Sequence, residues 1–191
     1  MTTGRREANR VRMRARLLTA ALRLFEEHGY EATTIDQIAA EADVARQTVL
    51  NHYPHKRDFL VEWGQDRRDQ LLDLADSDEP ARTRLHRYFA ALAAMNERER
   101  TLTRMLHVSL RHDEVVAHQH PVPDATIAAI SQGQQRGELR AELAARTVAE
   151  VVTAIYGDTL RRWLVDATPP FDLAAALAER LDLLLDGLTA R

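Results

Sequence analysis

The sequence predicts an all-α protein, in which an N-terminal three-helix domain with a helix-turn-helix precedes a six-helix domain. Apolar residues recur three and four positions apart along most of the chain, and no stretch alternates as a β-strand does. Proline and glycine separate the periodic segments. Residues 33–56 have the pattern of two short helices joined by a tight turn and ended by a proline, which indicates DNA binding.

The first periodic segment predicts a helix over residues 11–28, with Gly29 as its C-cap. Before it, the first sixteen residues hold six arginines and one acid, Glu7, a net charge of +5. We predict a flexible basic arm that attracts phosphate and reaches an adjacent groove, and the alternative is a solvated tail.

Thr34 and Gln37 have the spacing of a capping box, so a second helix should begin near Ile35. Asp43 tolerates the left-handed backbone that the turn requires. The next helix should turn Val44 and Val49 inward and leave a polar face outward, made of Arg46, Gln47, Thr48, Asn51 and His52. Such side chains pair with base edges, because Arg suits guanine and Gln or Asn suits adenine. An ordinary solvated helix face is the alternative.

The positions of proline and glycine set the limits of the remaining helices, which are predicted over residues 56–75, 81–97, 99–110, 124–136, 143–165 and 172–188. The basic character is confined to the N-terminal end, because residues 61–191 hold 16 arginines and 21 acidic residues. DNA should therefore meet the N-terminal end only. There is no cysteine, which excludes disulfides, and no apolar run long enough for a membrane helix or signal peptide. A cytoplasmic protein without a cofactor is expected.

The helix-turn-helix resembles the tetracycline-repressor (TetR) family of transcriptional regulators. The residues that match its pattern are Ala21, Leu24, Phe25, Gly29, Thr33, Thr34, Ile38, Ala39, Ala42, Val44, Thr48, His52, Tyr53 and Lys56, and residues 133–140 resemble a later turn of the family. The resemblance implies a DNA-binding domain over residues 1–55 and an effector-binding and dimerisation domain over 56–191. It also implies phosphate contacts at Thr34, His52 and Lys56. Geometry assigns base reading to Arg46, Gln47, Thr48 and Asn51.

Four positions depart from the family pattern, and at one of them Gln47 stands where the family frequently has Gly. Asp43 stands where the family usually has Gly, and Ala45 where a Ser usually opens the recognition helix, so that helix lacks a side-chain cap. Leu50 stands where the family often has a phosphate-contacting Tyr and cannot donate a hydrogen bond. These departures keep open an all-α interaction module that does not bind DNA.

The last two predicted helices carry wide apolar stripes. The resemblance implies that they pair with their copies in a homodimer, and an ordinary intrachain core is the alternative. The predicted dimer-interface residues are Val152, Trp163, Leu181, Leu184, Leu185 and Leu188.

The middle helices hold larger and softer apolar residues, which suit an adaptable pocket for a small apolar effector. Core packing is the alternative for each of them. The predicted ligand-binding residues are Trp63, Phe89, Leu92, Met105 and Tyr156.

Histidines between His107 and His120 leave open a metal-sensing regulator, although no Cys or carboxylate pattern fixes a geometry. No nucleophile elbow, phosphate-binding glycine loop or metalloprotease helix is present, so we expect no enzyme activity. The sequence thus predicts a homodimeric, ligand-responsive regulator, most simply a repressor that a small effector releases from its double-stranded operator DNA.

Overall fold

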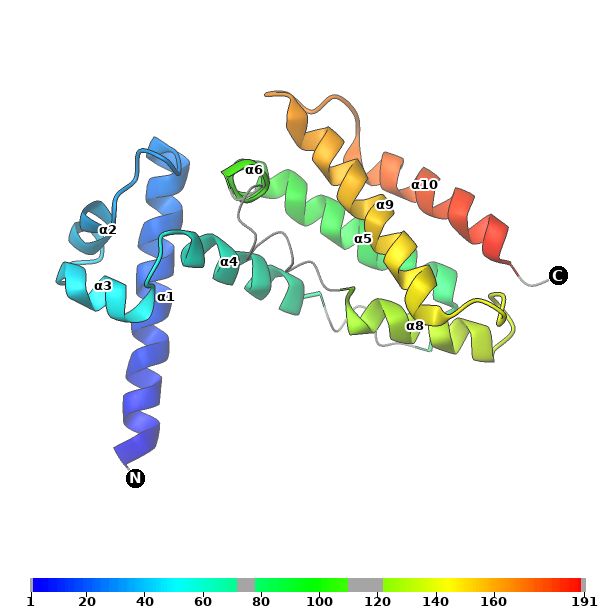
Figure 1. Cartoon of the computed structure of the whole chain (residues 1–191), viewed down its shortest axis with the longest axis horizontal. Coiled ribbons are helices and arrows are strands. Elements are labelled where there is room, and N and C mark those ends of the chain that lie inside the picture. Colours follow the sequence, from blue (N-terminus) through cyan, green and yellow to red (C-terminus); the bar gives the residue numbers. More distant parts are fainter. Residues whose placement is uncertain (1, 72–77, 110–121, 190–191) are drawn as a thin grey trace. The chain divides into compact units, whose positions relative to one another are not determined.

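The computed structural model describes residues 2–71, 78–109 and 122–189, and these residues form nine α-helices and no strand (Figure 1). They fall into two compact units. The first unit contains α1, α2, α3, most of α4 and α6, and the second contains α5, α8, α9 and α10. The predicted all-α fold with an N-terminal helix-turn-helix is confirmed. The functional boundary between residues 55 and 56 stays a prediction.

Helix α1 (Thr2–His28) is longer than expected. Its end is as predicted, because Gly29 has a φ of 86° and its N–H bonds the Phe25 carbonyl at 2.9 Å. The start of α1 differs from the prediction, because the residues expected to form a flexible arm are helical. Residues 4–12 are all exposed, so no apolar stripe marks them as a helix. They include four arginines, Glu7 and Ala8, residue types that favour helix by intrinsic propensity.

The helix-turn-helix consists of α2 (Ile35–Glu41) and α3 (Arg46–His52). Both bonds of the predicted capping box are present between Thr34 and Gln37. Asp43 has a φ of 48°, as the turn requires, and no side chain caps α3 at Ala45. Val49 is fully buried in the core that residues of α1, α2 and α4 share, so α3 packs on the rest of the unit through this residue.

Helix α4 (Arg57–Asp69) and helix α6 (Arg100–Ser109) complete the first unit. Phe59, Leu60 and Trp63 of α4 join the core that α1, α2 and α3 form. The predicted ends of these helices at residues 75 and 110 lie outside the described residues.

The second unit consists of α5 (Ala81–Arg98), α8 (Asp124–Gln135), α9 (Ala145–Val165) and α10 (Leu173–Leu188). Helices α5 and α9 each pack against both α8 and α10. Helix α8 approaches α5 closely at Gly133, where an added Cβ would lie 2.6 Å from the Ala81 Cβ. Helix α10 begins one residue later than predicted, because the Asp172 side chain caps it by accepting from Ala175 N–H at 2.8 Å.

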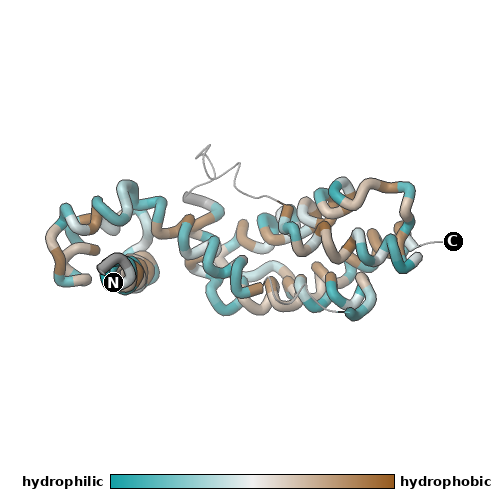
Figure 2. Tube along the Cα trace, turned by 90° about the horizontal axis from the view of Figure 1, so that it is seen from below, coloured by the Kyte–Doolittle hydropathy of each residue, from teal (hydrophilic) through white to brown (hydrophobic). Residues whose placement is uncertain are grey.

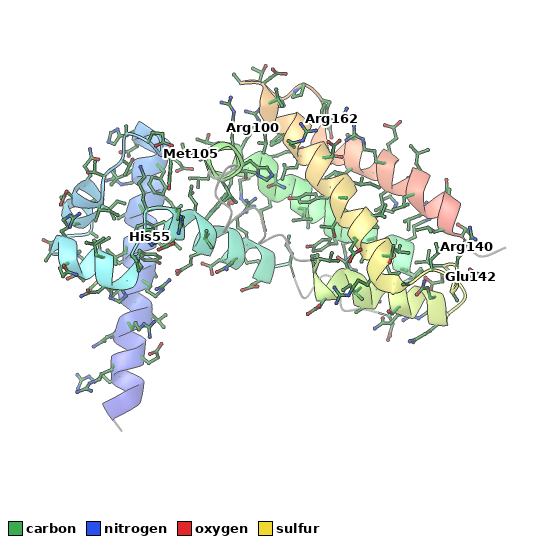
Figure 3. The ribbon with its side chains drawn as sticks, in the orientation of Figure 1. His55, Arg100, Met105, Arg140, Glu142 and Arg162 are labelled. Atoms are coloured by element: carbon green, nitrogen blue, oxygen red, sulfur yellow. The ribbon has the colours of Figure 1, made fainter. Side chains whose placement is uncertain are left out.

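Arg100, which is labelled in Figure 3, caps the carboxyl end of α9. Its guanidinium donates to the carbonyls of Trp163, Asp166 and Ala167 at 3.1, 2.6 and 2.7 Å, and lies over the Trp163 ring. Apolar and polar residues follow one another in short blocks along the helices of both units (Figure 2). In the described part of the chain, no helix combines the length and apolarity that crossing a membrane requires.

Candidate DNA-reading face and effector region

Helix α3 presents the polar face that the sequence predicts. Arg46, Gln47 and Asn51 are exposed, and Thr48 is half-buried. Gln47 Nε2 donates to Asn51 Oδ1 at 3.0 Å, one helical turn away. Arg46 Nε lies 3.2 Å from Asp36 Oδ1 on α2. The two amides therefore act as a pair, while the Arg46 guanidinium is aligned by an exposed ion pair that a guanine could replace.

The carboxyl end of α3 is fixed by a cluster that we call the Tyr53 anchor, formed by Arg14, Tyr53 and Glu62. The buried Tyr53 ring stacks on Phe59 with centroids 3.9 Å apart, and its hydroxyl donates to Glu62 Oε1 at 2.9 Å. Arg14 pairs with Glu62, lies over the Tyr53 ring and donates to the His52 carbonyl at 2.8 Å. The anchor therefore joins α1, α3 and α4 at one point.

The electrostatics of the Tyr53 anchor favour its present protonation state. Burial raises the pKa of the Tyr53 hydroxyl, and Glu62 raises it further, so the hydroxyl stays a donor. The hydrogen bond to Glu62 raises the pKa of Arg14. Sequence reasoning missed Tyr53 and Glu62 as a pair, because nine residues and a helix boundary separate them.

The residues predicted to contact phosphate differ in exposure and in the bonds that their side chains already make. The exposed Thr34 hydroxyl caps α2, and His52 is half-buried at the last turn of α3. Burial lowers the pKa of His52, and the charges of Arg14 and Arg10 lower it further. A nearby phosphate would act in the opposite direction, because it favours the charged imidazole.

The amino group of Lys56 is already occupied in the structure. Its Nζ donates to the carbonyls of Tyr30, Glu31 and Thr33 at 2.7, 3.3 and 3.1 Å, and lies 4.3 Å from the centre of the Tyr30 ring. An ammonium has three N–H donors, so these carbonyls use all of them. Lys56 thus fixes the loop between α1 and α2, and a phosphate contact requires its donors to leave these carbonyls.

The predicted ligand-binding residues belong to two different cores. Trp63 is buried and Met105 partly buried in the first unit. Phe89 and Leu92 are buried in the second unit, where Tyr156 packs against the same core with its ring 5.8 Å from that of Phe89. A polar residue that the sequence did not suggest lies beside them: buried Asn96 donates to the Tyr156 hydroxyl at 2.8 Å. This pair puts hydrogen-bonding capacity into an apolar interior.

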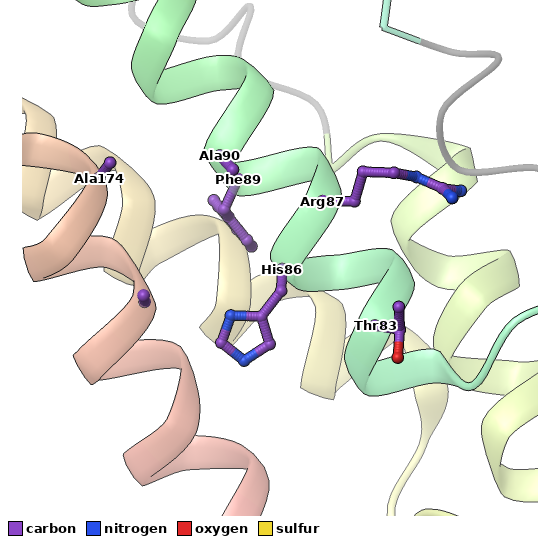
Figure 4. A pocket seen from close by; sticks show the side chains of 7 residues that line it. Thr83, His86, Arg87, Phe89, Ala90 and Ala174 are labelled. Atoms are coloured by element: carbon purple, nitrogen blue, oxygen red, sulfur yellow. The ribbon is translucent and has the colours of Figure 1, made fainter.

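A groove of about 370 Å³ runs between α5 and α10 in the second unit (Figure 4). Phe89 is the one predicted ligand-binding residue that lines it. His86 lies at its edge and contacts Asp182 of α10 at 2.9 Å. The lining residues are Thr83, His86, Arg87, Phe89, Ala90, Ala174 and Ala178.

The predicted dimer-interface residues need correction. Val152, Trp163, Leu181, Leu185 and Leu188 are buried within the second unit, each at most 9% exposed, and only Leu184 is partly exposed. A side chain already covered by its own chain cannot face a second copy, so the intrachain core explains the five buried residues, and an interface contact at Leu184 stays a prediction. The stripes are wide because α10 packs on both α5 and α9. The exposed large apolar residues of these two helices are instead Val151, Val165 and Leu183.

Most of the predicted histidine region between His107 and His120 lies outside the described residues. His107 is described, but residues 110–121 lie outside the described residues. Within residues 2–71, 78–109 and 122–189, no three His, Asp or Glu side chains are grouped as metal ligands.

Comparisons with known proteins agree with the helix-turn-helix geometry. The family model for bacterial regulatory proteins of the tetR family matches residues 17–62. The solved structure of Thermus thermophilus FadR, a TetR-family transcriptional repressor in complex with lauroyl-CoA, superposes with a TM-score of 0.77. It is 29% identical, over 93% of this chain and 96% of that one.

Two curated relatives cover most of the chain. The fatty acid metabolism regulator protein of Bacillus subtilis is 22% identical, over 90% of this chain and 93% of its own length. The HTH-type transcriptional repressor KstR of Rhodococcus jostii is 28% identical, over 90% of this chain and 82% of its own length. Residues 17–62, which form the helix-turn-helix and the parts of α1 and α4 that pack on it, thus match the TetR family of bacterial regulatory proteins, and most of the chain is similar to regulators of that kind.

Proposed function

We propose that this protein is a homodimeric repressor that binds operator DNA through α3 and leaves it when a fatty acyl thioester binds the second unit. The observation that carries the DNA-binding part is the exposed face of Arg46, Gln47 and Asn51 on a helix held at its end by the Tyr53 anchor. Base reading requires donors and acceptors on a rigid element, and this face supplies both.

The effector class is inferred from relatives and from the second unit. The Thermus thermophilus repressor holds lauroyl-CoA, and the Bacillus subtilis relative is a regulator of fatty acid metabolism. The second unit of this chain has an apolar core that includes Phe89 and Leu92, with Asn96 and Tyr156 as a buried polar pair. Burying an acyl chain in such an interior contributes about 0.8 kcal/mol per methylene, which suits a ligand with a long chain.

The regulatory step would be a shift of population. An acyl thioester that binds the DNA-incompetent arrangement of the dimer better than the competent one must lower operator affinity, and operator DNA must lower the affinity for the thioester by the same factor. In that scheme the second unit senses the ligand and the first unit reads DNA, with no reaction catalysed.

The dimer would use the outer face of α9 and α10, which we define by Val151, Val165 and Leu183. Their side chains are 43%, 61% and 71% exposed. Val151 and Val165 are fourteen positions apart, so they lie on one side of α9. A twofold interface brings the same patch of both copies together and would cover these side chains.

Binding to a duplex from the region upstream of the protein's own gene tests the DNA-binding part. We expect binding that exceeds binding to random DNA by at least about a thousandfold, as specific regulators show. Equal affinity for both duplexes would favour the interaction module, which the departures at Asp43, Ala45 and Leu50 keep open.

A further inference from the structure

The amino-terminal extension of α1, residues 4–12, is an exposed, strongly basic helix with no apolar face of its own. Its arginines are Arg5, Arg6, Arg10 and Arg12, and Glu7 is its one acid. Arg5, Arg6 and Arg10 form no ion pair or hydrogen bond with any part of the chain that the structure describes. The extension is therefore a surface with three cations available to a partner.

Helical periodicity divides these arginines between two sides of α1. Arg6, Arg10 and Arg14 follow one another four residues apart, and Leu17, three residues after Arg14, lies on the same side and is fully buried in the first unit. We call this line the inner stripe. Arg5, Asn9, Arg12 and Arg16 form an outer stripe, in which Arg12 donates to Asn9 and Arg16 lies 3.8 Å from Asp43.

The inner stripe continues directly from the end of the recognition helix. Arg14 donates to the His52 carbonyl in the last turn of α3, and Arg10 lies close enough to affect the titration of His52. Arg6 is eight residues before Arg14, about 12 Å along the helix axis. Each strand of duplex DNA carries about one phosphate per 3.4 Å of helix axis, so this length parallel to the axis passes roughly three to four phosphates of one strand.

The spacing of these arginines destabilises the helical extension in the DNA-free protein. Arg6, Arg10 and Arg14 are like charges four residues apart, a spacing that destabilises a helix slightly. Only Arg14 is compensated inside the protein, by Glu62. A polyanion beside the inner stripe would remove the repulsion and would give Arg6 and Arg10 a partner of complementary charge.

We propose that the inner stripe, through Arg6 and Arg10, binds the sugar-phosphate backbone of the DNA that flanks each operator half-site. This inference rests on the proposed function, since it places the extension beside the duplex that α3 reads. It replaces the predicted groove-entering arm, because a rigid helix presents its arginines along the backbone instead of threading a chain into a groove. It lengthens the DNA footprint without adding base contacts.

The test uses two double variants of the full-length protein with equal loss of charge. Arg6→Ala with Arg10→Ala removes the inner stripe, and Arg5→Ala with Arg12→Ala is the matched control on the outer stripe. Each is titrated from 50 to 200 mM salt against the operator duplex with ten flanking base pairs and against a duplex cut at the half-site edges. Circular dichroism and thermal melting confirm that both variants fold like the wild type.

On the long duplex, we expect the slope of log affinity against log salt concentration to be smaller by about two per protomer in the inner-stripe variant. We also expect this variant to bind at least about tenfold more weakly than the wild type. The control should lose less than half as much slope. On the short duplex, the inner-stripe variant and the wild type should bind alike. Equal losses in the two variants, an unchanged slope, or an equal loss on the short duplex would overturn the proposal.

A failure of the proposed function would look different. Because phosphate contacts do not depend on sequence, the two variants are also compared on a random duplex of the same long length. In one outcome, the wild type binds operator and random DNA equally while its salt slope still depends on the inner stripe. That result would contradict the proposed operator-specific function and would still support the backbone contact. An equal loss of binding to polyglutamate would assign the inner stripe to acidic proteins and contradict the DNA assignment.

Discussion

Asn51 and Gln47 share a hydrogen bond on the exposed face of α3, so each holds the other's amide in a fixed orientation. Fixed amides lose less rotamer entropy when they meet a base edge. We therefore expect Asn51→Ala to lower discrimination between operator and random DNA by roughly 1–3 kcal/mol for the base pair that it reads. Competition binding measures the ratio. Arg98→Ala, on the exposed side of α5 and paired with Glu99, is the control, because its loss of charge affects operator and random DNA alike. An unchanged ratio in Asn51→Ala would refute the base-reading assignment.

Lys56 has two possible roles that salt dependence separates. If its three carbonyl contacts persist on DNA, Lys56→Met should lower the free energy of unfolding by about 1–3 kcal/mol and weaken DNA binding without changing the salt slope. Urea unfolding and salt titration measure the two effects. A slope lower by about one, with stability unchanged, would restore the phosphate contact that the family resemblance implies.

At the residue scale, sequence reasoning succeeded where the signal is local. The capping box at Thr34, the left-handed Asp43 and the inward Val49 all follow from neighbours within a few positions. The carbonyl contacts of Lys56 and the Asn96–Tyr156 pair depend on segments brought together by folding. Nothing in the spacing of these residues indicates them.

At the scale of elements, the Tyr53 anchor links the recognition helix to α4, which makes it a point where a movement of α4 would reach α3. The Tyr53 hydroxyl and the Glu62 carboxylate are bonded to each other, so their contributions should not add. We expect Tyr53→Phe and Glu62→Gln each to lower the free energy of unfolding by roughly 1 kcal/mol or more, and the double variant to lose at least about 0.5 kcal/mol less than the sum. Denaturant unfolding of the four proteins provides the cycle. Additive losses would show that the hydroxyl and carboxylate do not stabilise one another.

Helix α1 shows why element boundaries were partly missed. The segment from residue 11 was detected because Leu17, Ala21 and Leu24 bury one side. The extension before it buries nothing, and only propensity indicates a helix there. Apolar patterning therefore does not predict the extension as helix. An anionic partner would stabilise it, because no tertiary packing does.

At the scale of the whole molecule, burial separates two kinds of leucine on α10. Leu181 is 2% exposed and Leu183 is 71% exposed, so a charge at each position should act differently. We expect Leu183→Asp to give folded monomers with weaker operator binding, because it places a charge in the proposed twofold interface. Leu181→Asp should instead destabilise the protomer by several kcal/mol, since it buries an unpaired charge. Light scattering and thermal melting distinguish the cases, and a dimeric Leu183→Asp would place the interface on another surface.

The fold class and the DNA-reading face could be predicted because a helix-turn-helix is a local motif with fixed spacing. The effector region could not, because an apolar side chain that lines a cavity and one that fills a core have the same sequence pattern. The same ambiguity applies to the dimer interface, because the pattern of Leu181 and Leu185 fits a partner surface as well as the intrachain core that buries them.

The central claim is that one ligand couples the two units, and a parallel titration tests it most directly. Lauroyl-CoA is added to the protein on a fluorescent operator duplex while anisotropy is followed, and the DNA-free protein is melted at the same ligand concentrations, with CoA alone as the control. Linkage requires that ligand binding raise the melting temperature of the free protein and lower operator affinity together. We expect both changes with lauroyl-CoA and neither with CoA. A ligand that stabilises the protein while operator affinity stays constant would contradict the account.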